Sequence, residues 1–311
     1  MIIKPRFKES ILSLLVYLKL DIIFSLLYAT LIYYLYEQHN LTFLASFSFM
    51  PVSFFGAILS VFLAFRNNSA YARWWEARQL WGDLINASRM FAMQTMTYPL
   101  GQQQPAQTLH ETQSQMIRRH IAIVHLMRMQ LRQDVRLERV KQYLNTDDQI
   151  TAQNAINPAV MLLLSQGRHL QQLYDEGLLS DFRFISLNDT LTRFHNILGA
   201  CERIKNTPFP REYDRFVRYL IWILTSIIPI YFLGIFSDDL SKMLIIPISV
   251  ALQLIIGFAN KAGALMEDPF ENRVHDIPMT SMCNTIERDL IQQLGAHDIP
   301  EKTLPKHGVL W

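Results

Sequence analysis

The sequence predicts an all-α membrane protein with four transmembrane helices and a large, mostly helical region between the second and third. Two observations lead to this fold class. Half of the 311 residues are apolar and only 18% are charged, whereas about 25% charged residues is usual in soluble domains. The apolar residues concentrate towards both ends of the chain, while residues 100–180 are strongly polar. No strand-like alternation and no internal repeat is found along the chain.

Four segments have the length and composition of membrane spans, because a helix needs about 20 mostly apolar residues to cross the hydrocarbon core. We expect the spans at about residues 20–36, 43–65, 216–237 and 242–260. The second lies in the longest uncharged stretch, which runs from Asn40 to Phe65. Residues 10–18 are expected to form an amphipathic helix at the interface that leads into the first span.

Basic residues flank the four predicted spans on one side. They precede the first and third spans and follow the second and fourth. These residues are Lys4, Arg6, Lys8, Arg66, Arg73, Arg78, Arg211, Arg215, Arg218 and Lys261. The opposite side carries Glu37, His39, Asp238, Asp239 and Lys242. The positive-inside rule therefore predicts cytoplasmic termini and a cytoplasmic helical region formed by residues 66–215 and 261–311.

The predicted cytoplasmic region is too long and too regular to be a linker. Apolar residues recur at helical spacing in Met116–Leu131. Three further helices are expected at Val160–Leu164, Leu191–Ile204 and Thr280–Leu294. Gly101–Gln107 and Thr146–Asn157 are expected to be loops.

Several function classes are disfavoured by the residues present. Cys201 and Cys283 form neither a disulfide framework nor a metal-binding pattern, and we expect both to be reduced. His120 and His125 are five residues apart and fall on different helical faces. A net charge of +2 gives no general attraction to nucleic acid. No nucleophile with its base and no phosphate-binding loop is present, so an enzyme is not expected.

The most distinctive stretch is Phe65–Arg89, where the uncharged second span meets a polar segment. Its arginines can extend to the headgroup layer and its tryptophans suit the same layer. These residues are Arg66, Arg73, Trp74, Trp75, Arg78 and Trp81. Spacing alone favours an interfacial anchor, and a functional basic vestibule is the alternative.

Two motifs in this part of the chain resemble the bacterial branch of the bestrophins. The first is MPVSF at Met50–Phe54, and the second is FRNNSAYARWWEAR at Phe65–Arg78. The resemblance continues through Ala200-Cys201 and the last two spans to Asp268–Asn272, where the family has Asn-Pro-Phe-Gly before an acidic run. It covers most of residues 10–295, and the polar segment 101–157 carries little of it.

This resemblance implies a homopentameric ion channel whose second span lines a central pore. It places three apolar rings of a neck at Met50, Phe54 and Ile58, which lie on one helical face. Such a constriction can gate by dewetting. From the residues alone, the same stripe could instead pack against another helix. The resemblance also implies a cytoplasmic aperture, which counting back from Cys201 places at Ile185, with Leu187 as the second candidate.

One departure from the family concerns calcium. Eukaryotic bestrophins bind calcium through an acidic cluster after Pro-Phe-Gly. Here the stretch Glu271–Asp276 offers two or three carboxylates interrupted by Arg273 and His275, whereas calcium takes six to eight oxygen ligands. We expect no calcium gate, no metal and no cofactor.

The expected partners are further copies of the chain, the lipid bilayer of the bacterial inner membrane and small monovalent ions. Selectivity stays open, because the family is classed with chloride and other anion channels while bacterial members are also expected to pass cations such as sodium. The acidic predicted outer loops favour cations. The charged residues that could decide it are Glu37, Arg66, Arg73, Asp181, Arg183, Asp189, Asp238 and Asp239.

Two other functions are the alternatives. A secondary transporter usually shows repeats and polar groups at the midplane of its spans, and the uncharged interiors of the second to fourth predicted spans argue against it. A membrane-anchored scaffold or signalling protein would use the large cytoplasmic region to bind a partner.

Overall fold

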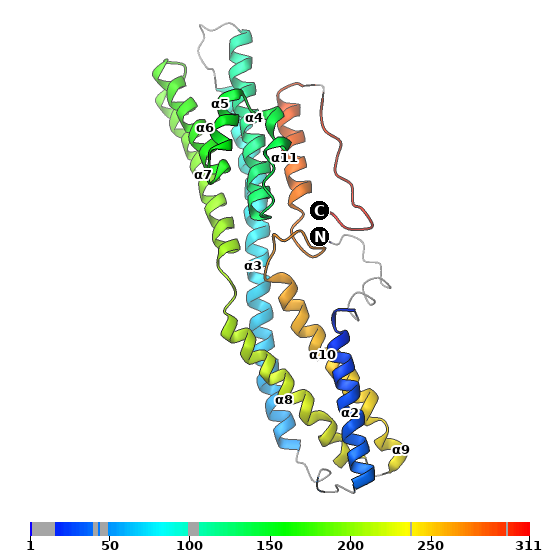
Figure 1. Ribbon diagram of the computed structural model, residues 1–311. Coiled ribbons are helices and arrows are strands. Elements are labelled where there is room, and N and C mark those ends of the chain that lie inside the picture. The colour runs from blue at the N-terminus through cyan, green and yellow to red at the C-terminus, as the bar shows by residue number, and fades with distance from the viewer. Residues whose placement is uncertain (2–15, 40–42, 44–48, 99–105, 237, 297) are drawn as a thin grey trace. The chain divides into compact units, whose positions relative to one another are not determined.

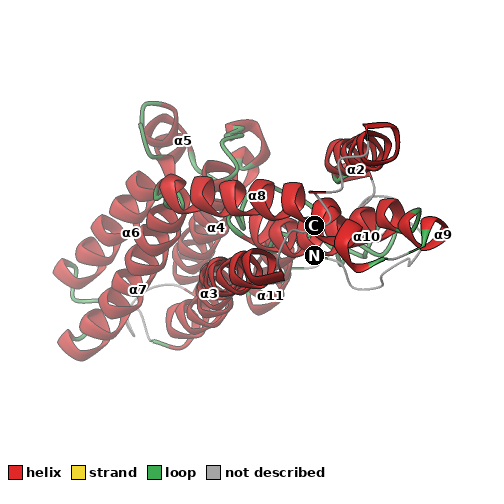
Figure 2. Cartoon of the chain, turned by 90° about the horizontal axis from the view of Figure 1, so that it is seen from below, coloured by secondary structure: helices red, strands yellow, loops and turns green. Residues whose placement is uncertain are grey.

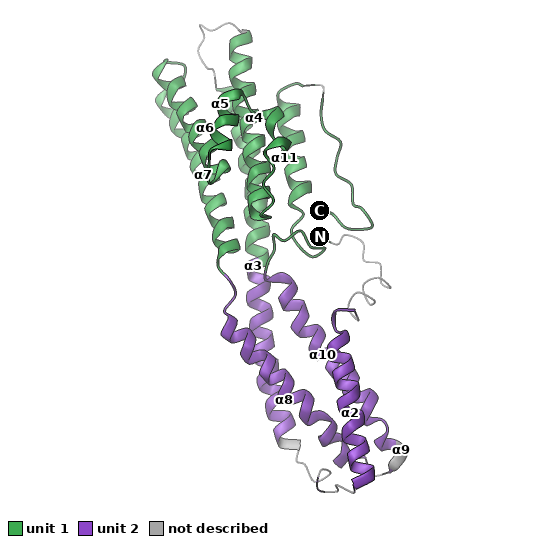
Figure 3. Ribbon diagram, viewed as in Figure 1, with its two compact units in different colours: residues 1–3, 74–207, 268–311 green, residues 4–73, 208–267 purple. Residues whose placement is uncertain are grey.

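The computed structural model describes residues 1, 16–39, 43, 49–98, 106–236, 238–296 and 298–311 (Figure 1). Within these residues the regular structure is helical (Figure 2), and the only β-type pairing is an isolated bridge between Lys306 and Val309. This confirms the predicted all-α class for the described part of the chain. Two compact units are distinguished in Figure 3. Unit 1 comprises residues 1–3, 74–207 and 268–311, and unit 2 comprises residues 4–73 and 208–267.

Unit 2 contains the apolar helices. They are α2 (Lys19–His39), the first part of α3 (Phe49–Thr97), α8 (Arg211–Ile235), the short α9 (Asp239–Lys242) and α10 (Ile245–Met266). By length and composition, α2, α8 and α10 can each cross a membrane, and they coincide with the first, third and fourth predicted spans. The span predicted at 43–65 falls partly on residues 44–48, which lie outside the described residues. The count of four spans therefore stays a prediction.

Apolar packing holds unit 2 together. Leu59 and Leu63 of α3, four residues apart on one helical face, pack in a buried cluster with Leu220 of α8. Helix α10 packs against both α2 and α8. One buried polar contact joins these helices, because the Thr225 hydroxyl donates to Gln253 Oε1 over 2.6 Å. Both polar groups are thereby satisfied away from water.

Unit 1 is a helical bundle around a continuous apolar core. It contains the second part of α3, α4 (Ala106–Leu131), α5 (Thr146–Gln153), α6 (Pro158–Asp175), α7 (Asp181–Asn206) and α11 (Met279–Gln293), with two 3₁₀ turns, η2 (Leu137–Arg139) and η3 (Lys141–Tyr143). Helix α4 packs against α6, α7 and α11. The four helices predicted for this region lie within α4, α6, α7 and α11, apart from a one-residue excess at the end of α11.

The loop predicted at Thr146–Asn157 is wrong, because most of it forms α5. Asn145 caps this helix, with its side-chain oxygen accepting a hydrogen bond from Asp148 N over 2.8 Å. The Asp148 carboxylate is buried and accepts from Arg119 Nε of α4 over 2.7 Å. Gln166 of α6 accepts a second bond from the Arg119 guanidinium at 3.0 Å. Asp148, one of the polar residues that suggested a loop, is therefore satisfied by a distant arginine.

Helix α3 runs without a break from Phe49 to Thr97, so the span end predicted at residue 65 is not a helix end. Trp81, which the sequence suggested for the headgroup layer, is fully buried in the core of unit 1. It shares one helical face with Leu84 and Phe91, which are also buried there. The headgroup placement of Trp81 is wrong, because this part of α3 is a bundle helix.

Candidate functional site

One face of α3 in unit 2 is exposed among the residues that the structure describes. Phe54, Val61 and Phe65 are 60, 53 and 65% exposed, and their spacing of seven and four residues puts them on one helical stripe. The opposite stripe, which includes Leu59 and Leu63, is buried against the rest of the unit. Large apolar side chains in a continuous exposed stripe mark a surface that meets lipid, ligand or another protein.

The three predicted neck residues fall differently on this helix. Phe54 points away from the covered face and is the most exposed of those that can be assessed. Ile58 is half-buried and touches the apolar cluster behind α3. Met50 lies in the first turn of α3, and its side chain is outside the described residues. Their role as neck residues remains a prediction.

Arg66 ends the apolar stretch and is the centre of a buried polar cluster. Its side chain is 3% exposed, and its Nη2 atom lies 2.7 Å from both Asp214 Oδ1 and Glu267 Oε1. Its Nη1 atom donates to the Asn260 side chain and, over 3.2 Å, to the Asn260 carbonyl. The guanidinium therefore joins α3 to α8 and to α10 with its C-cap residue, and two carboxylates neutralise it.

Sequence reasoning missed these partners of Arg66. It treated Arg66 as a side chain that reaches for headgroups, with a role in a basic vestibule. The available signal was that Asp214 precedes the third predicted span and Glu267 follows the fourth. Both were thus expected on the same side of the membrane as Arg66. Opposite charges at one depth of the membrane tend to pair.

Asn67 holds the next turn of α3 against α10. Its Nδ2 atom donates to the Ala259 carbonyl over 2.9 Å. A Cβ atom added at Gly263 would overlap the Asn67 side-chain oxygen, so the close approach requires glycine there. The motif FRNN is therefore a helix-packing motif, in which Arg66 and Asn67 set the position of α3 on its neighbours.

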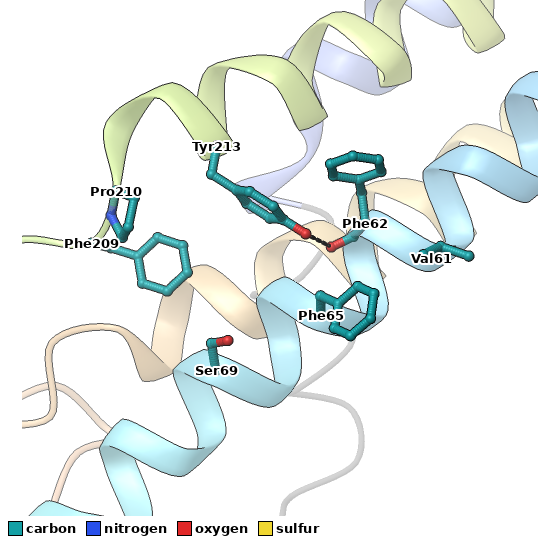
Figure 4. Close-up of a pocket in the computed structure, with 7 residues that line it drawn as sticks. All are labelled: Val61, Phe62, Phe65, Ser69, Phe209, Pro210 and Tyr213. Atoms are coloured by element: carbon teal, nitrogen blue, oxygen red, sulfur yellow. Dashed lines mark hydrogen bonds between the residues drawn. The ribbon is translucent and has the colours of Figure 1, made fainter.

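An apolar pocket of about 520 Å³ lies beside this cluster, between α3 and the start of α8 (Figure 4). It is lined by Val61, Phe62, Phe65, Ser69, Phe209, Pro210 and Tyr213. The Tyr213 hydroxyl donates to the Phe62 carbonyl over 3.0 Å, which ties the start of α8 to α3. Because Val61 and Phe65 also belong to the exposed stripe, the pocket extends the uncovered apolar surface of α3.

The remaining residues of the predicted vestibule are divided between the two units. Arg73 belongs to unit 2, whereas Trp74, Trp75 and Arg78 belong to unit 1. Trp74 donates from Nε1 to the His275 carbonyl over 3.2 Å, and its ring stacks on Trp75 at a centroid distance of 6.4 Å. Trp75 is 47% exposed, and Arg78 is half-buried. Trp74 thus has a structural contact.

The two candidates for the lower aperture are separated clearly. Leu187 is buried in the core of unit 1, with 1% of its surface exposed, and its place at the aperture stays a prediction. Ile185 is 55% exposed on α7. The neighbouring Ser186 hydroxyl anchors this turn, since it accepts a bond from Gln94 Nε2 over 3.0 Å and lies 3.0 Å from the Tyr98 hydroxyl. Ile185 therefore projects from a backbone held on α3.

The sequence and the fold were compared with known proteins. A profile of the family described as Bacterial/Fungal Bestrophin protein matches residues 6–292. The chain belongs to the bestrophin family. Voltage-dependent anion channel-forming protein YneE of Escherichia coli (strain K12) is 34% identical over 261 residues, which are 83% of this chain and 81% of YneE. The Salmonella typhimurium protein of the same name is 32% identical over the same lengths.

A solved bestrophin structure has the same fold. The crystal structure of a bacterial bestrophin homolog from Klebsiella pneumoniae matches with a TM-score of 0.79 and 25% identity, covering 90% of this chain and 99% of that one. The resemblance seen in the FRNN and RWWE motifs is confirmed by this match and by the family profile. The chain is accordingly a bestrophin with membrane-spanning helices.

The stretch that corresponds to the family's acidic run is occupied by internal contacts. Glu271 pairs with Lys205 of α7, and Asp276 Oδ2 accepts a hydrogen bond from Arg273 N over 2.9 Å. Pro269 and Phe270, the matching Pro-Phe pair, are buried. No group of three or more His, Cys, Asp or Glu side chains suited to a metal is found within the described residues.

Proposed function

We propose that this bestrophin is an ion channel in which five copies of α3 surround a central pore for small monovalent ions. The uncovered stripe of Phe54, Val61 and Phe65 supports the proposal most strongly. A bestrophin chain with such a stripe needs partners for it, and a ring of identical helices supplies them. The relatives named as voltage-dependent anion channel-forming proteins belong to the same functional class. This role requires no catalytic group.

Flux through the purified protein in liposomes tests the class of function. A channel gives fast flux that does not saturate with ion concentration, whereas a secondary transporter saturates and a membrane-anchored scaffold gives none. The mass of the detergent-solubilised assembly, measured separately, should equal five chains of 36.3 kDa each. A monomer or dimer would contradict the pore geometry.

The neck is proposed at Met50, Phe54 and Ile58. Apolar rings one helical turn apart form a narrow constriction that water leaves readily, and their removal should widen it. The triple variant Met50→Ala, Phe54→Ala, Ile58→Ala should raise single-channel conductance. A matched control is Leu20→Ala, Leu27→Ala, Leu31→Ala, which removes three exposed apolar side chains from α2. Equal conductance of the neck variant and wild type would show that the narrowest point of the pore lies elsewhere.

The lower aperture is proposed at Ile185. Ile185→Ala should raise conductance or change the order of ion permeability, since it enlarges a ring of five side chains. Ile150→Ala on α5 is the control, because this isoleucine is also about half exposed, at 52%. If both variants behave like wild type, Ile185 does not border the conduction path.

Selectivity in this proposal comes from charged side chains outside the apolar neck. Arg66 contributes little positive charge, because Asp214 and Glu267 neutralise it. Asp181 and Asp189 of α7 are exposed, which favours cations at the lower opening. Reversal potentials under a tenfold gradient of sodium chloride decide between cation and anion selectivity. A potential close to that of chloride would contradict the cation preference.

We further propose that gating needs no calcium or other cofactor, that the channel resides in the bacterial inner membrane, and that unit 1 and both termini face the cytoplasm. The pairing of Glu271 with Lys205 supports the first point, because it removes a carboxylate from any calcium cluster. Strong activation by micromolar calcium would contradict it. Protease accessibility in inverted vesicles tests the orientation, since unit 1 should be cleaved without detergent.

A further inference from the structure

Arg128 of α4 and Arg132, the residue directly after this helix, converge on a single hydroxyl group at the start of α11. Arg128 Nη1 donates to Thr280 Oγ1 over 3.2 Å, and Arg132 Nη1 donates to the same atom over 2.7 Å. The two arginines are four residues apart and therefore lie on one helical face. All three residues belong to unit 1. Two positive charges thus share one neutral acceptor.

Three further nitrogens of these arginines are buried without acceptors. Arg128 is 8% exposed, and its Nε atom has no hydrogen-bond partner; neither do Nε and Nη2 of Arg132. Within the described residues neither guanidinium forms an ion pair. Burial, followed by the neighbouring Arg128, lowers the pKa of Arg132 to about 10. A buried and unpaired charge is costly, so such groups normally have a counter-ion.

Neither of the two carboxylates that act electrostatically on these arginines, Glu287 and Asp276, forms an ion pair with them. Glu287 accepts the Tyr143 hydroxyl over 2.5 Å, and its other oxygen lies 2.8 Å from His125 Nε2. Asp276 binds the Arg273 amide through Oδ2, while its Oδ1 is buried without a hydrogen-bond partner and its charge acts against the lowering of the Arg132 pKa. These side chains reduce the local positive potential without supplying an acceptor to Arg128 or Arg132.

The start of α11 adds a further attraction for an anion. This helix has 15 residues and no acidic side chain in its first turn, although an oxygen of Trp311, the last residue of the sequence, accepts a bond from Ser281 N over 2.7 Å and so occupies part of this helix end. Met279 N and Met282 N bond to the carbonyls of Ile277 and Pro278, whereas the Thr280 amide has no acceptor among the described residues. Thr280 also has a hydroxyl hydrogen to donate, since its oxygen accepts from both arginines.

We propose that Arg128, Arg132 and the first turn of α11 at Thr280 form a binding site for an oxyanion, either a phosphate group or a carboxylate of a small molecule. Guanidinium forks match the paired oxygens of these groups better than a spherical halide. Thr280 and Arg132 are partly exposed, which gives the ligand a route from solvent. The site is separate from the proposed pore residues and does not depend on channel activity.

The test measures anion binding to the full-length protein in detergent. Inorganic phosphate and acetate are titrated separately at constant chloride and ionic strength, with melting temperature and calorimetric heat as readouts. Saturable stabilisation by at least one of them is expected. A response to phosphate alone identifies a phosphate ligand, and one to acetate alone identifies a carboxylate. No saturable response to either overturns the proposal.

Variants assign the response to these residues. Arg128→Gln should weaken binding at least tenfold, because a charged hydrogen-bond donor is lost. Arg132→Lys keeps the charge at a less buried position and should fold even where Arg128→Gln does not. It should still weaken binding severalfold, because lysine lacks the fork. Arg136→Gln is the matched control at an exposed arginine of the same region, paired with Asp134, and should bind like wild type. Equal binding by Arg132→Lys and the control overturns the proposal.

Discussion

Units 1 and 2 differ in which surfaces they leave uncovered. Unit 2 exposes large apolar side chains along its helices, including Leu20, Phe65 and Ile255 at 73, 65 and 65%. Unit 1 instead covers a continuous apolar core, and it buries polar groups in pairs such as Arg119 with Asp148 and His120 with Ser88. The difference indicates that unit 2 is built for surroundings without water, whereas unit 1 has the organisation of a water-exposed helical bundle.

Both units nevertheless use one buried arginine to join helices that are distant in sequence. In unit 1 the Arg119 pair is enclosed, since both side chains are 5% exposed. In unit 2 the carboxylates around Arg66 are 29 and 21% exposed. Substitutions of these two arginines therefore compare the units directly. Cys201 and Cys283 are free, buried and confined to unit 1, so thiol labelling reports the opening of that unit.

The largest effect is expected for Arg119→Met. It leaves the Asp148 carboxylate buried without its partner, and breaking a buried pair costs about 3–5 kcal/mol. Burial raises the pKa of both cysteine thiols to about 12, so labelling should be slow in the native state and much faster in this variant. Unchanged labelling would mean that the Asp148 carboxylate stays buried without Arg119 at little cost in stability.

A smaller effect is expected for Arg66→Met, about 2–3 kcal/mol, because Asp214 and Glu267 can recover part of their hydration. The melting temperature in detergent should fall while thiol labelling of unit 1 stays slow. The added changes Asp214→Asn and Glu267→Gln should restore part of the loss by removing the orphaned charges. Accelerated labelling in Arg66→Met would show that the units do not unfold independently.

The next effect concerns pH and unit 1. His120 is fully enclosed, and burial lowers its pKa to about 3. Between about pH 6.5 and pH 3 the unfolded chain binds a proton that the native chain does not, so stability falls as the pH is lowered. The loss between pH 7 and pH 5 should reach about 2 kcal/mol. His120→Gln should flatten this dependence, whereas His110→Gln, at an exposed histidine of α4, should not.

The smallest effect is expected for Arg203→Met, which removes an exposed pair with Glu76 in unit 1. The two side chains are 67 and 47% exposed, and such pairs contribute about 0–1 kcal/mol. Its melting temperature should match wild type within about 2 °C. A large fall in melting temperature would mean that an exposed ion pair stabilises unit 1 as strongly as a buried one.

The features that could be predicted from the sequence were local ones. Spans with uniform apolar composition, such as the one in α10, and stripes with helical spacing, such as Met116–Leu131, were recognised correctly. The FRNN motif led to the right family. The errors at Thr146–Asn157 and Trp81 share one cause. In each case the structure depends on a partner far along the chain, the buried Arg119 or the core of unit 1, and local composition does not contain that information.

The same limit applied to the candidate site. The stripe of Met50, Phe54 and Ile58 could be derived from spacing. The neutralisation of Arg66 was missed, because Asp214 and Glu267 lie about 150 and 200 residues further along the chain and only their side of the membrane was expected. The different exposure of Ile185 and Leu187 likewise depends on the packing of α7, which buries Leu187 and leaves Ile185 half exposed. Sequence reasoning placed residues on a helix face more reliably than it decided which face is covered.

The Arg66 cluster has a consequence for the order of biosynthesis. Arg66 precedes Glu267 by 201 residues, and ribosomes add about 5–20 residues per second. Glu267 is therefore synthesised about 10–40 s after Arg66. During this interval an extended side chain at the headgroups is the favourable arrangement. Chains arrested before Asp214 should therefore respond to anionic lipid at Arg66, and completed chains should not. An equal response of arrested and completed chains would show that Asp214 and Glu267 do not change how Arg66 meets the lipid. If the expected difference is found, the extended arginine inferred from the sequence describes the nascent chain, and the ion pair describes the finished chain.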